Sequence, residues 1–164
     1  MNPTPAEQAS PPGDLQPARR DWLRVLARAR GTDLARLAQP VLQDFRFEPL
    51  RAPEAGLVMV RARIGNSGDR FNLGEATVAR CVVRHRAADG SVVAGVGHVL
   101  GTDTAHAERV ACLDALLQRP ACHALVMRSV VQPLSDIDAQ RCAAERAATE
   151  TSRVRFYTLQ PENA

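Results

Sequence analysis

The fold is decided by the stretch EATVARCVVRHR at residues 75–86, the dipeptide Asp89-Gly90, and the stretch SVVAGVGHVL at residues 91–100. Both stretches are rich in valine, a β-branched residue that favours strands. Asp-Gly between two such runs is a strong hairpin signal, because its residues adopt the left-handed backbone that a tight turn needs. These residues therefore predict two adjacent antiparallel strands.

A further strand is expected before this hairpin. Residues 57–64 alternate, so that Val58 and Val60 lie on one face while Leu57 and Arg61 lie on the other. An extended stretch begins earlier, at Phe45, and residues 154–159 alternate in the same way. Because short connections favour antiparallel pairing, we expect an antiparallel β-sheet of about four to five strands.

Helical periodicity appears on both sides of these strands. Trp22, Leu23 and Leu26 recur at helical spacing and predict a helix over residues 18–30. A second helix is expected over residues 33–39, with Thr32 as its N-cap and Pro40 interrupting the pattern. A third is expected over residues 104–119, with Asp103 as its N-cap and Pro120 at its end. Two more are expected over residues 123–131 and 135–149. The fold class is α+β, a β-sheet flanked by N-terminal and C-terminal helices.

The domain organisation follows from length and composition. The chain has 164 residues, enough for one ordinary domain. Residues 1–17 contain five prolines and too little apolar surface to offset the entropy of ordering. We expect a disordered Pro-rich tail over residues 1–17 and a single domain over residues 18–160.

The basic residues are all arginine: Lys+Arg is 21, and the sequence contains no lysine. This excludes Schiff-base lysine chemistry and a P-loop lysine. The guanidinium group binds phosphate or carboxylate through two parallel hydrogen bonds, although genome composition explains the bias more simply. The net charge of +3 and the 4% aromatic content are weak support for nucleic-acid binding. An Arg-rich binding module remains an alternative.

The four cysteines indicate the compartment. They are Cys81, Cys112, Cys122 and Cys142, and none forms a C-x-x-C pair. The N-terminus lacks the apolar core of a secretory signal, and no run approaches the roughly 20 apolar residues of a membrane span. We therefore expect a cytoplasmic protein with reduced thiols and no membrane association.

His106 and Glu108 suggest one enzymatic alternative. The pattern H-x-E is found in zinc deaminases, where the histidine binds the metal and the glutamate moves a proton. Only Cys122 follows at a suitable place, so the second thiolate of the usual ligand set is missing. The simpler interpretation is that both are ordinary residues of a first helical turn, but a stand-alone zinc hydrolase or deaminase remains an alternative.

Three further sets of residues are candidate binding groups. The connection over residues 64–75, with Asn72, Gly74 and Glu75, could form an anion nest or be a hairpin loop with glycine at its bends. A row of arginines is expected across two neighbouring strands, with Arg80, Arg84 and Arg86 on one face of the first and Arg61 and Arg63 on one face of the second. This row could bind a polyphosphate, contact a partner, or be a solvated face with paired acids.

Gly95 and Gly97 share one side of a strand, with His98 opposite. Glycine inside a strand often marks the close approach of another backbone or a ligand. His98 could act as an acid or base, although a histidine in such a position is more often a satisfied interior residue.

Specific strings of residues resemble a known family. They are RAPEAGLVMVRARIG at 51–65, FNLGEATVARC at 71–81, GHVLGTD at 97–103, HAE at 106–108, LDALLQ at 113–118 and VRFYTL at 154–159. Over roughly residues 22–159 the sequence resembles the G-subunit family, PhnG, of the bacterial carbon–phosphorus lyase system, and FNLGE followed by TVARC is the most specific part.

The resemblance implies an accessory subunit. In that family the G subunit works with H, I and L subunits to make α-D-ribose 1-methylphosphonate 5-triphosphate from ATP and methylphosphonate, with release of adenine, and a J subunit later cleaves the carbon–phosphorus bond. It implies direct binding to an I-like subunit within a complex that includes H-, J- and L-like subunits, activity only within that complex, and no nucleic acid partner. ATP and methylphosphonate are then substrates of the complex, and this chain binds no cofactor or metal alone.

The resemblance identifies no catalytic residue. The residues we expect to contact a partner or ligand are Arg61, Arg63, Asn72, Gly74, Glu75, Arg80, Cys81, His98, His106 and Glu108.

Overall fold

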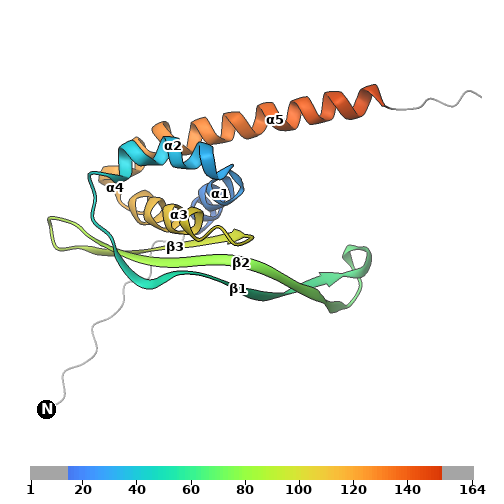
Figure 1. Cartoon of the computed structure of the whole chain (residues 1–164), viewed down its shortest axis with the longest axis horizontal. Helices are drawn as coiled ribbons and strands as arrows, with labels where there is room; N and C mark the ends of the chain where they lie inside the picture. The colour runs from blue at the N-terminus through green and yellow to red at the C-terminus, as the bar shows by residue number, and fades with distance from the viewer. Residues whose placement is uncertain (1–14, 153–164) are drawn as a thin grey trace, which may run out of the picture.

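The computed structural model describes residues 15–152, which form an antiparallel sheet with helices packed on one face (Figure 1). The predicted α+β class is confirmed. The sheet of the described residues has three strands, fewer than the expected four to five. The expected strand over residues 154–159 and most of the expected tail over residues 1–17 lie outside the described residues.

The strands are long and follow the order β1-β2-β3: β1 is Glu48–Arg63, β2 is Arg70–Arg86 and β3 is Val92–Leu100. A 3₁₀ turn, η1 (Ile64–Asn66), lies between β1 and β2. The stretch expected from Phe45 and the strand expected over residues 57–64 correspond to one strand, β1, which begins only at Glu48 and ends at Arg63. Pro49 and Pro53 are tolerated in it because β1 is an edge strand, where a missing N–H can be left unpaired. The Asp89-Gly90 turn is confirmed, and Gly90 has φ 81°.

The helices match the expected regions with shifted ends, but Thr32 is not the expected N-cap: it lies inside the second helix, whose N-cap is Arg30. They are α1 (Leu15–Arg28), α2 (Gly31–Leu42), α3 (Thr104–Leu117), α4 (Pro120–Val126), the π-helical turn η2 (Met127–Val131) and α5 (Gln132–Thr151). Asp103 caps α3 as predicted, since its side chain accepts a hydrogen bond from the His106 N–H.

Three proline expectations were wrong. Pro17 lies in the first turn of α1, where its missing N–H removes no helical hydrogen bond. Pro40 lies inside α2, which continues to Leu42 because the buried Val41 holds that turn against the core. Pro120 does not end α3, which already ends at Leu117; it occupies the start of α4, where proline is favoured.

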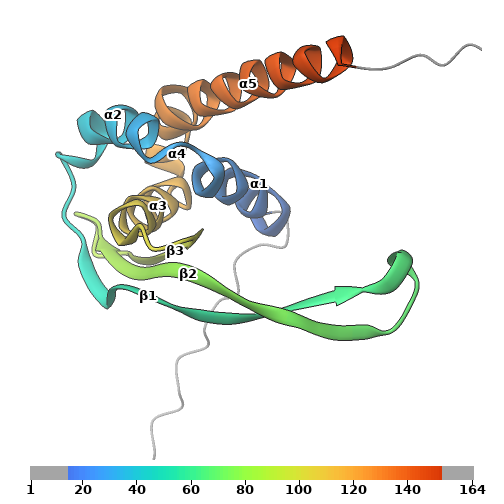
Figure 2. The same cartoon turned by 45° about the vertical axis from the view of Figure 1, so that its right-hand side comes forward.

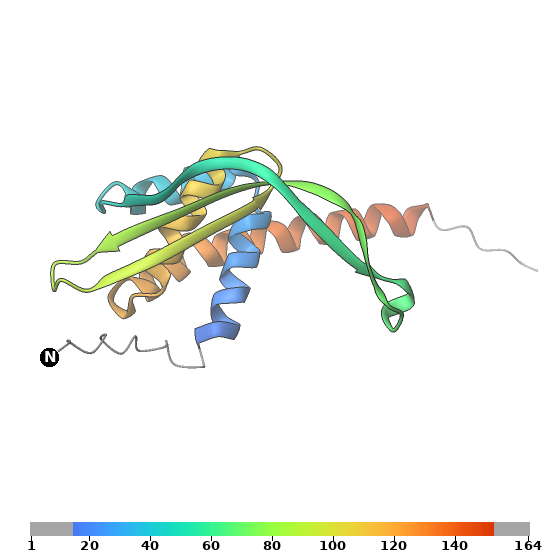
Figure 3. The ribbon, with the colours of Figure 1, turned by 90° about the horizontal axis from the view of Figure 1, so that it is seen from below.

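The core forms around α3, which lies against the sheet with α1 beside it and α2 on its far side (Figure 2). Val110, Leu113, Leu116 and Leu117 are almost completely buried on this helix. Trp22 and Leu26 of α1 pack into the same cluster. The helix layer thus covers one face of the sheet, and the opposite face carries no helix of the described residues (Figure 3).

Two glycines let α3 approach β3 closely. A Cβ atom added to Gly97 would overlap the carbonyl oxygen of Ala107, and one added to Gly95 would overlap that of Ala111. The expected close approach of another backbone is therefore confirmed.

We predict that Gly97→Ala destabilises the protein by about 3 kcal/mol or more, because the new methyl group must displace a helix backbone. Gly56→Ala is the matched control: its added Cβ would lie 3.6 Å from Arg80 Nη2, an ordinary contact, and should change stability by less than about 1 kcal/mol. Urea unfolding measures both. Equal unfolding midpoints for the two variants would contradict the proposed overlap.

Candidate interaction surface

The most prominent surface feature is a two-stranded ribbon, residues 57–63 of β1 with residues 70–77 of β2. It extends past the end of β3, which pairs only with Val78–Arg86 (Figures 1 and 3). The ribbon carries large apolar side chains in the open: Leu57 is 62% exposed, Met59 53% and Leu73 64%. Exposed apolar side chains gathered on one part of a protein are typical of a surface that binds a partner.

The pairing register gives the ribbon two different faces. On one face, Val58, Val60 and Ala62 stand opposite Ala76, Gly74 and Phe71, so this face is entirely apolar. On the other face, Met59 stands opposite Glu75, Arg61 opposite Asn72, and Arg63 opposite Arg70. The apolar face is continuous with the uncovered face of the sheet, because paired residues share a face across the strands.

The expected hairpin connection over residues 64–75 is shorter than predicted and covers only residues 64–69. β2 already begins at Arg70, so Asn72, Gly74 and Glu75 lie within a strand. An anion nest needs successive N–H groups that converge, whereas the N–H groups of a strand alternate between its two sides. The strand extends through this polar sequence because β1 pairs with it residue by residue, with a bulge that leaves Leu73 without a partner.

The expected row of five arginines is divided by the register. Arg61 and Arg63 lie toward the end of the ribbon, whereas Arg80 and Arg84 lie where the sheet is three strands wide. Strand spacing alone could not place them, because the register of pairing decides which residues are neighbours.

Arg80 and Arg84 each bind an acid of β1. Arg80 Nε donates to Glu54 Oε1 at 2.8 Å, and Arg51 Nε donates to the same oxygen at 2.7 Å. Arg84 Nη2 donates to Glu48 Oε2 at 2.6 Å. The hydrogen bond from Arg80 and then that from Arg51 hold the pKa of Glu54 below its ordinary value. For Arg80 and Arg84, the structure therefore agrees with the sequence alternative of a face with paired acids.

Two other candidates lie on opposite sides of the sheet. His98 is exposed on β3 and stands opposite Arg80, so it is not the satisfied interior residue that its position suggested. Cys81 was expected to contact a partner, but it is completely buried beneath the helices, because odd-numbered residues of this part of β2 face α3.

His106 has a structural role in this fold. Its ring is buried, and Nε2 lies 2.9 Å from the carbonyl oxygen of Leu26, which joins the start of α3 to α1. Glu108 is exposed on the same helix. Within residues 15–152 no three His, Cys, Asp or Glu side chains gather as a metal site requires, so the zinc alternative gains no support.

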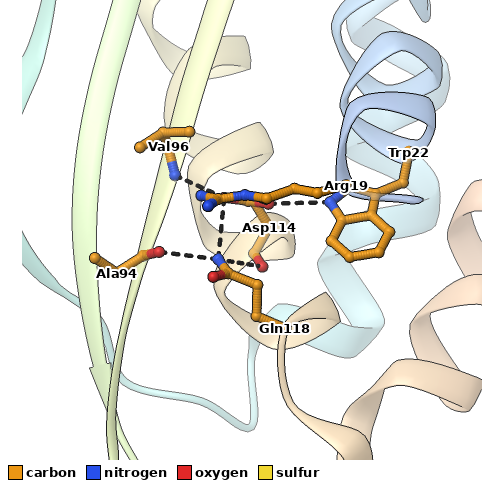
Figure 4. Close-up of polar contacts among 6 residues, drawn as sticks. All are labelled: Arg19, Trp22, Ala94, Val96, Asp114 and Gln118. Carbon is orange, nitrogen blue, oxygen red and sulfur yellow. Dashed lines mark hydrogen bonds and ion pairs between the residues drawn. The ribbon is translucent and has the colours of Figure 1, made fainter. Parts of the chain in front are cut away.

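Sequence reasoning missed the buried carboxylate of Asp114 (Figure 4). Arg19 donates to it through Nε at 3.1 Å and Nη2 at 2.6 Å, and Trp22 Nε1 donates at 3.0 Å. The Val96 N–H donates at 2.9 Å and Gln118 Nε2 at 3.2 Å. An aspartate inside the apolar run LDALL was the available signal, because a buried acid must have partners.

We predict that Asp114→Asn costs on the order of 3–5 kcal/mol of stability, because the change leaves Arg19 without its carboxylate and turns an amide N–H toward existing donors. The control is Asp138→Asn, which breaks an accessible ion pair with Arg141 and should cost less than about 1 kcal/mol. Urea unfolding of both variants tests the difference, and similar losses would contradict a special role for Asp114.

Burial suppresses the ionisation of two thiols. It raises the pKa of Cys112 to about 12, with a smaller contribution from Glu108, and it also raises the pKa of Cys81. The unfolded chain ionises near the ordinary value of 9.0, so above that pH it loses protons that the folded chain retains.

Stability should therefore be fully present below pH 9.0 and fall as the pH rises toward 12. We predict that the contribution of Cys112 to this fall approaches about 1.4 kcal/mol per pH unit. Unfolding free energies at several pH values for the wild type, Cys112→Ala and Cys142→Ala measure it. Only Cys112→Ala should flatten the slope; equal slopes for all three proteins would contradict the assignment.

Within residues 15–152, the uncovered sheet face and the exposed apolar ribbon give this small α+β protein the kind of surface that protein-binding subunits carry. No helix in residues 15–152 is long and apolar enough to cross a membrane.

Comparison with known proteins identifies the family. The sequence profile described as "Phosphonate metabolism protein PhnG" matches residues 17–160. The protein "Alpha-D-ribose 1-methylphosphonate 5-triphosphate synthase subunit PhnG" of Rhizobium meliloti (strain 1021) is 46% identical over 144 residues, which cover 86% of this chain and 87% of that protein. The chain belongs to the PhnG family of phosphonate metabolism proteins, as its motifs predicted.

Proposed function

We propose that this chain is an accessory subunit of α-D-ribose 1-methylphosphonate 5-triphosphate synthase, acting in the catabolism of organic phosphonates. Membership of the PhnG family and the relative named as a subunit of that synthase support the assignment. The observation that carries the accessory role is the ribbon, whose apolar face has no cover among the described residues. The four cysteines of the chain are all free, which fits a reducing cytoplasm.

The reaction explains why such a subunit is useful. A phosphonate oxygen of methylphosphonate replaces adenine at C1′ of ATP, through a transition state with oxocarbenium character. Water would intercept that sugar cation, so the site must be closed and its reactants held in place. We propose that ATP and methylphosphonate bind to the complex, that this chain carries no cofactor of its own, and that it contributes surface which closes or orders the site.

The direct partner in this proposal is an I-like subunit, within a complex that also includes H-, J- and L-like subunits. The ribbon supplies Asn72, Gly74 and Glu75 to the contact, with Arg61 and Arg63 toward its end. Arg80 and His98 lie farther along the sheet on its exposed face. Because Arg80 is held by Glu54, whereas Arg61 and Arg63 lie on the exposed ribbon, the latter two are the better candidates for a triphosphate or an acidic partner surface.

We predict that Val60→Asp abolishes co-purification with the cognate I-like subunit, because it places a charge on the apolar face of the ribbon. Leu125→Asp is the matched control, since Leu125 is an exposed apolar residue on α4, away from the ribbon. Both variants should remain folded by circular dichroism.

The two variants also test the location of the interface. The proposed interface fails if Val60→Asp still co-purifies at the wild-type level, or if Leu125→Asp weakens binding equally. Absence of a complex with the wild-type chain would overturn the proposed function itself.

A further inference from the structure

One edge of β2 is open along the ribbon. β1 pairs with β2 from Arg70 to Arg84, but β3 pairs only from Val78 onward. The last contact on the β3 side is the hydrogen bond from the Gly101 N–H to the Thr77 carbonyl oxygen, at 2.9 Å. The chain then leaves the sheet, because Gly101 has φ 101° and Asp103 begins the cap of α3.

The direction of the backbone groups follows from this hydrogen bond. In an antiparallel ladder the N–H and C=O of one residue point to the same side, and successive residues alternate. Since the Thr77 carbonyl points to the β3 side, the N–H and C=O of Glu75 also point there. No strand of the described residues occupies that side, so Glu75 presents a donor and an acceptor to an incoming backbone.

The apolar side chains beside this edge would also contact a strand added along it. Leu100, at the end of β3, is 78% exposed, and Leu73 in the bulge of β2 is 64% exposed. A strand lying along residues 70–77 would continue the line of β3, reach both leucines and cover the edge of the apolar face formed by Ala76 and Phe71.

The open edge of β1 is less suitable for an added strand over residues 49–54. β1 carries Pro49 and Pro53, and its pairing is irregular between Pro49 and Glu54. Proline is a usual device that stops an edge from accepting another strand. The edge of β2 over residues 70–77 has no proline, and its one bulge, at Leu73, leaves Glu75 and Thr77 in regular pairing.

We propose that an extended segment of the partner subunit adds to β2 at residues 70–77 as a fourth strand of the sheet. This inference rests on the proposed function, because it names the way in which the subunit docks. The segment binds through backbone hydrogen bonds and presents apolar side chains on the face shared with Val60 and Phe71.

Proline substitution at a cross-strand pair tests the proposal. Glu75 stands opposite Met59, and their N–H groups point to opposite open edges of the ribbon. Neither Glu75→Pro nor Met59→Pro therefore removes a bond between β1 and β2, and proline is tolerated at such edge positions. Glu75→Gln keeps the N–H and removes only the charge.

Binding of each folded variant to the cognate I-like subunit is measured by titration. We expect Glu75→Pro to weaken binding about tenfold or more, and by at least about threefold more than Glu75→Gln, which loses only the side-chain charge, whereas Met59→Pro should remain within about threefold of the wild type. Hydrogen exchange gives a second readout, in which the Glu75 amide becomes protected in the complex and the Met59 amide does not.

Each contrary result has a separate meaning. Wild-type binding by Glu75→Pro, or an equal loss in Met59→Pro, overturns the added strand while the proposed function stands. If the wild-type chain instead forms a dimer that Glu75→Pro abolishes, the occupant is a second copy and the partner strand is overturned. If the wild type binds no I-like subunit, the proposed function and this inference both fail.

Discussion

The carboxylate of Asp114 is the contact on which the arrangement of the protein depends. Burying a charge costs several kcal/mol unless it is paired and fully hydrogen-bonded. Here the charge is matched by Arg19 and Trp22 of α1 and by the Val96 N–H of β3. The observed placement of α1, α3 and β3 supplies all of these donors, and a placement that lost them would leave a buried charge unpaired at a cost of several kcal/mol.

This fixed body holds the base of the ribbon. Gly95 and Gly97 let α3 lie directly on β3, and β2 is trapped between β3 and β1. β1 and β2 then continue past the end of β3, and past α1 and α3, as a ribbon without buried core residues beneath it (Figures 1 and 3). Rigid placement at one end and open surface at the other would let this protein present a strand pair whose direction is set before a partner binds.

Local sequence patterns predicted most helices and strands well, but they predicted poorly which residues lie next to one another in space. Valine alternation and Asp89-Gly90 were enough to predict β2 and β3, and Asp103 correctly marked the start of α3. The polar residues 70–75 hid the first part of β2, because its pairing with β1 outweighs its weak strand propensity. The register separated Arg61 from Arg80, and the partners of Asp114 lie up to 95 residues away. These are long-range relations, and the spacing of residues within one segment does not contain them.

The open ribbon also affects the solubility of the chain in the absence of partner subunits. An unpaired strand edge beside exposed leucine, valine and methionine is a template for aggregation. A chain made in excess of its partners would carry this liability, whereas a chain in the complex would not. The amount of usable protein in a cell would then follow the supply of partner subunits, and balanced synthesis becomes a requirement that the surface itself imposes.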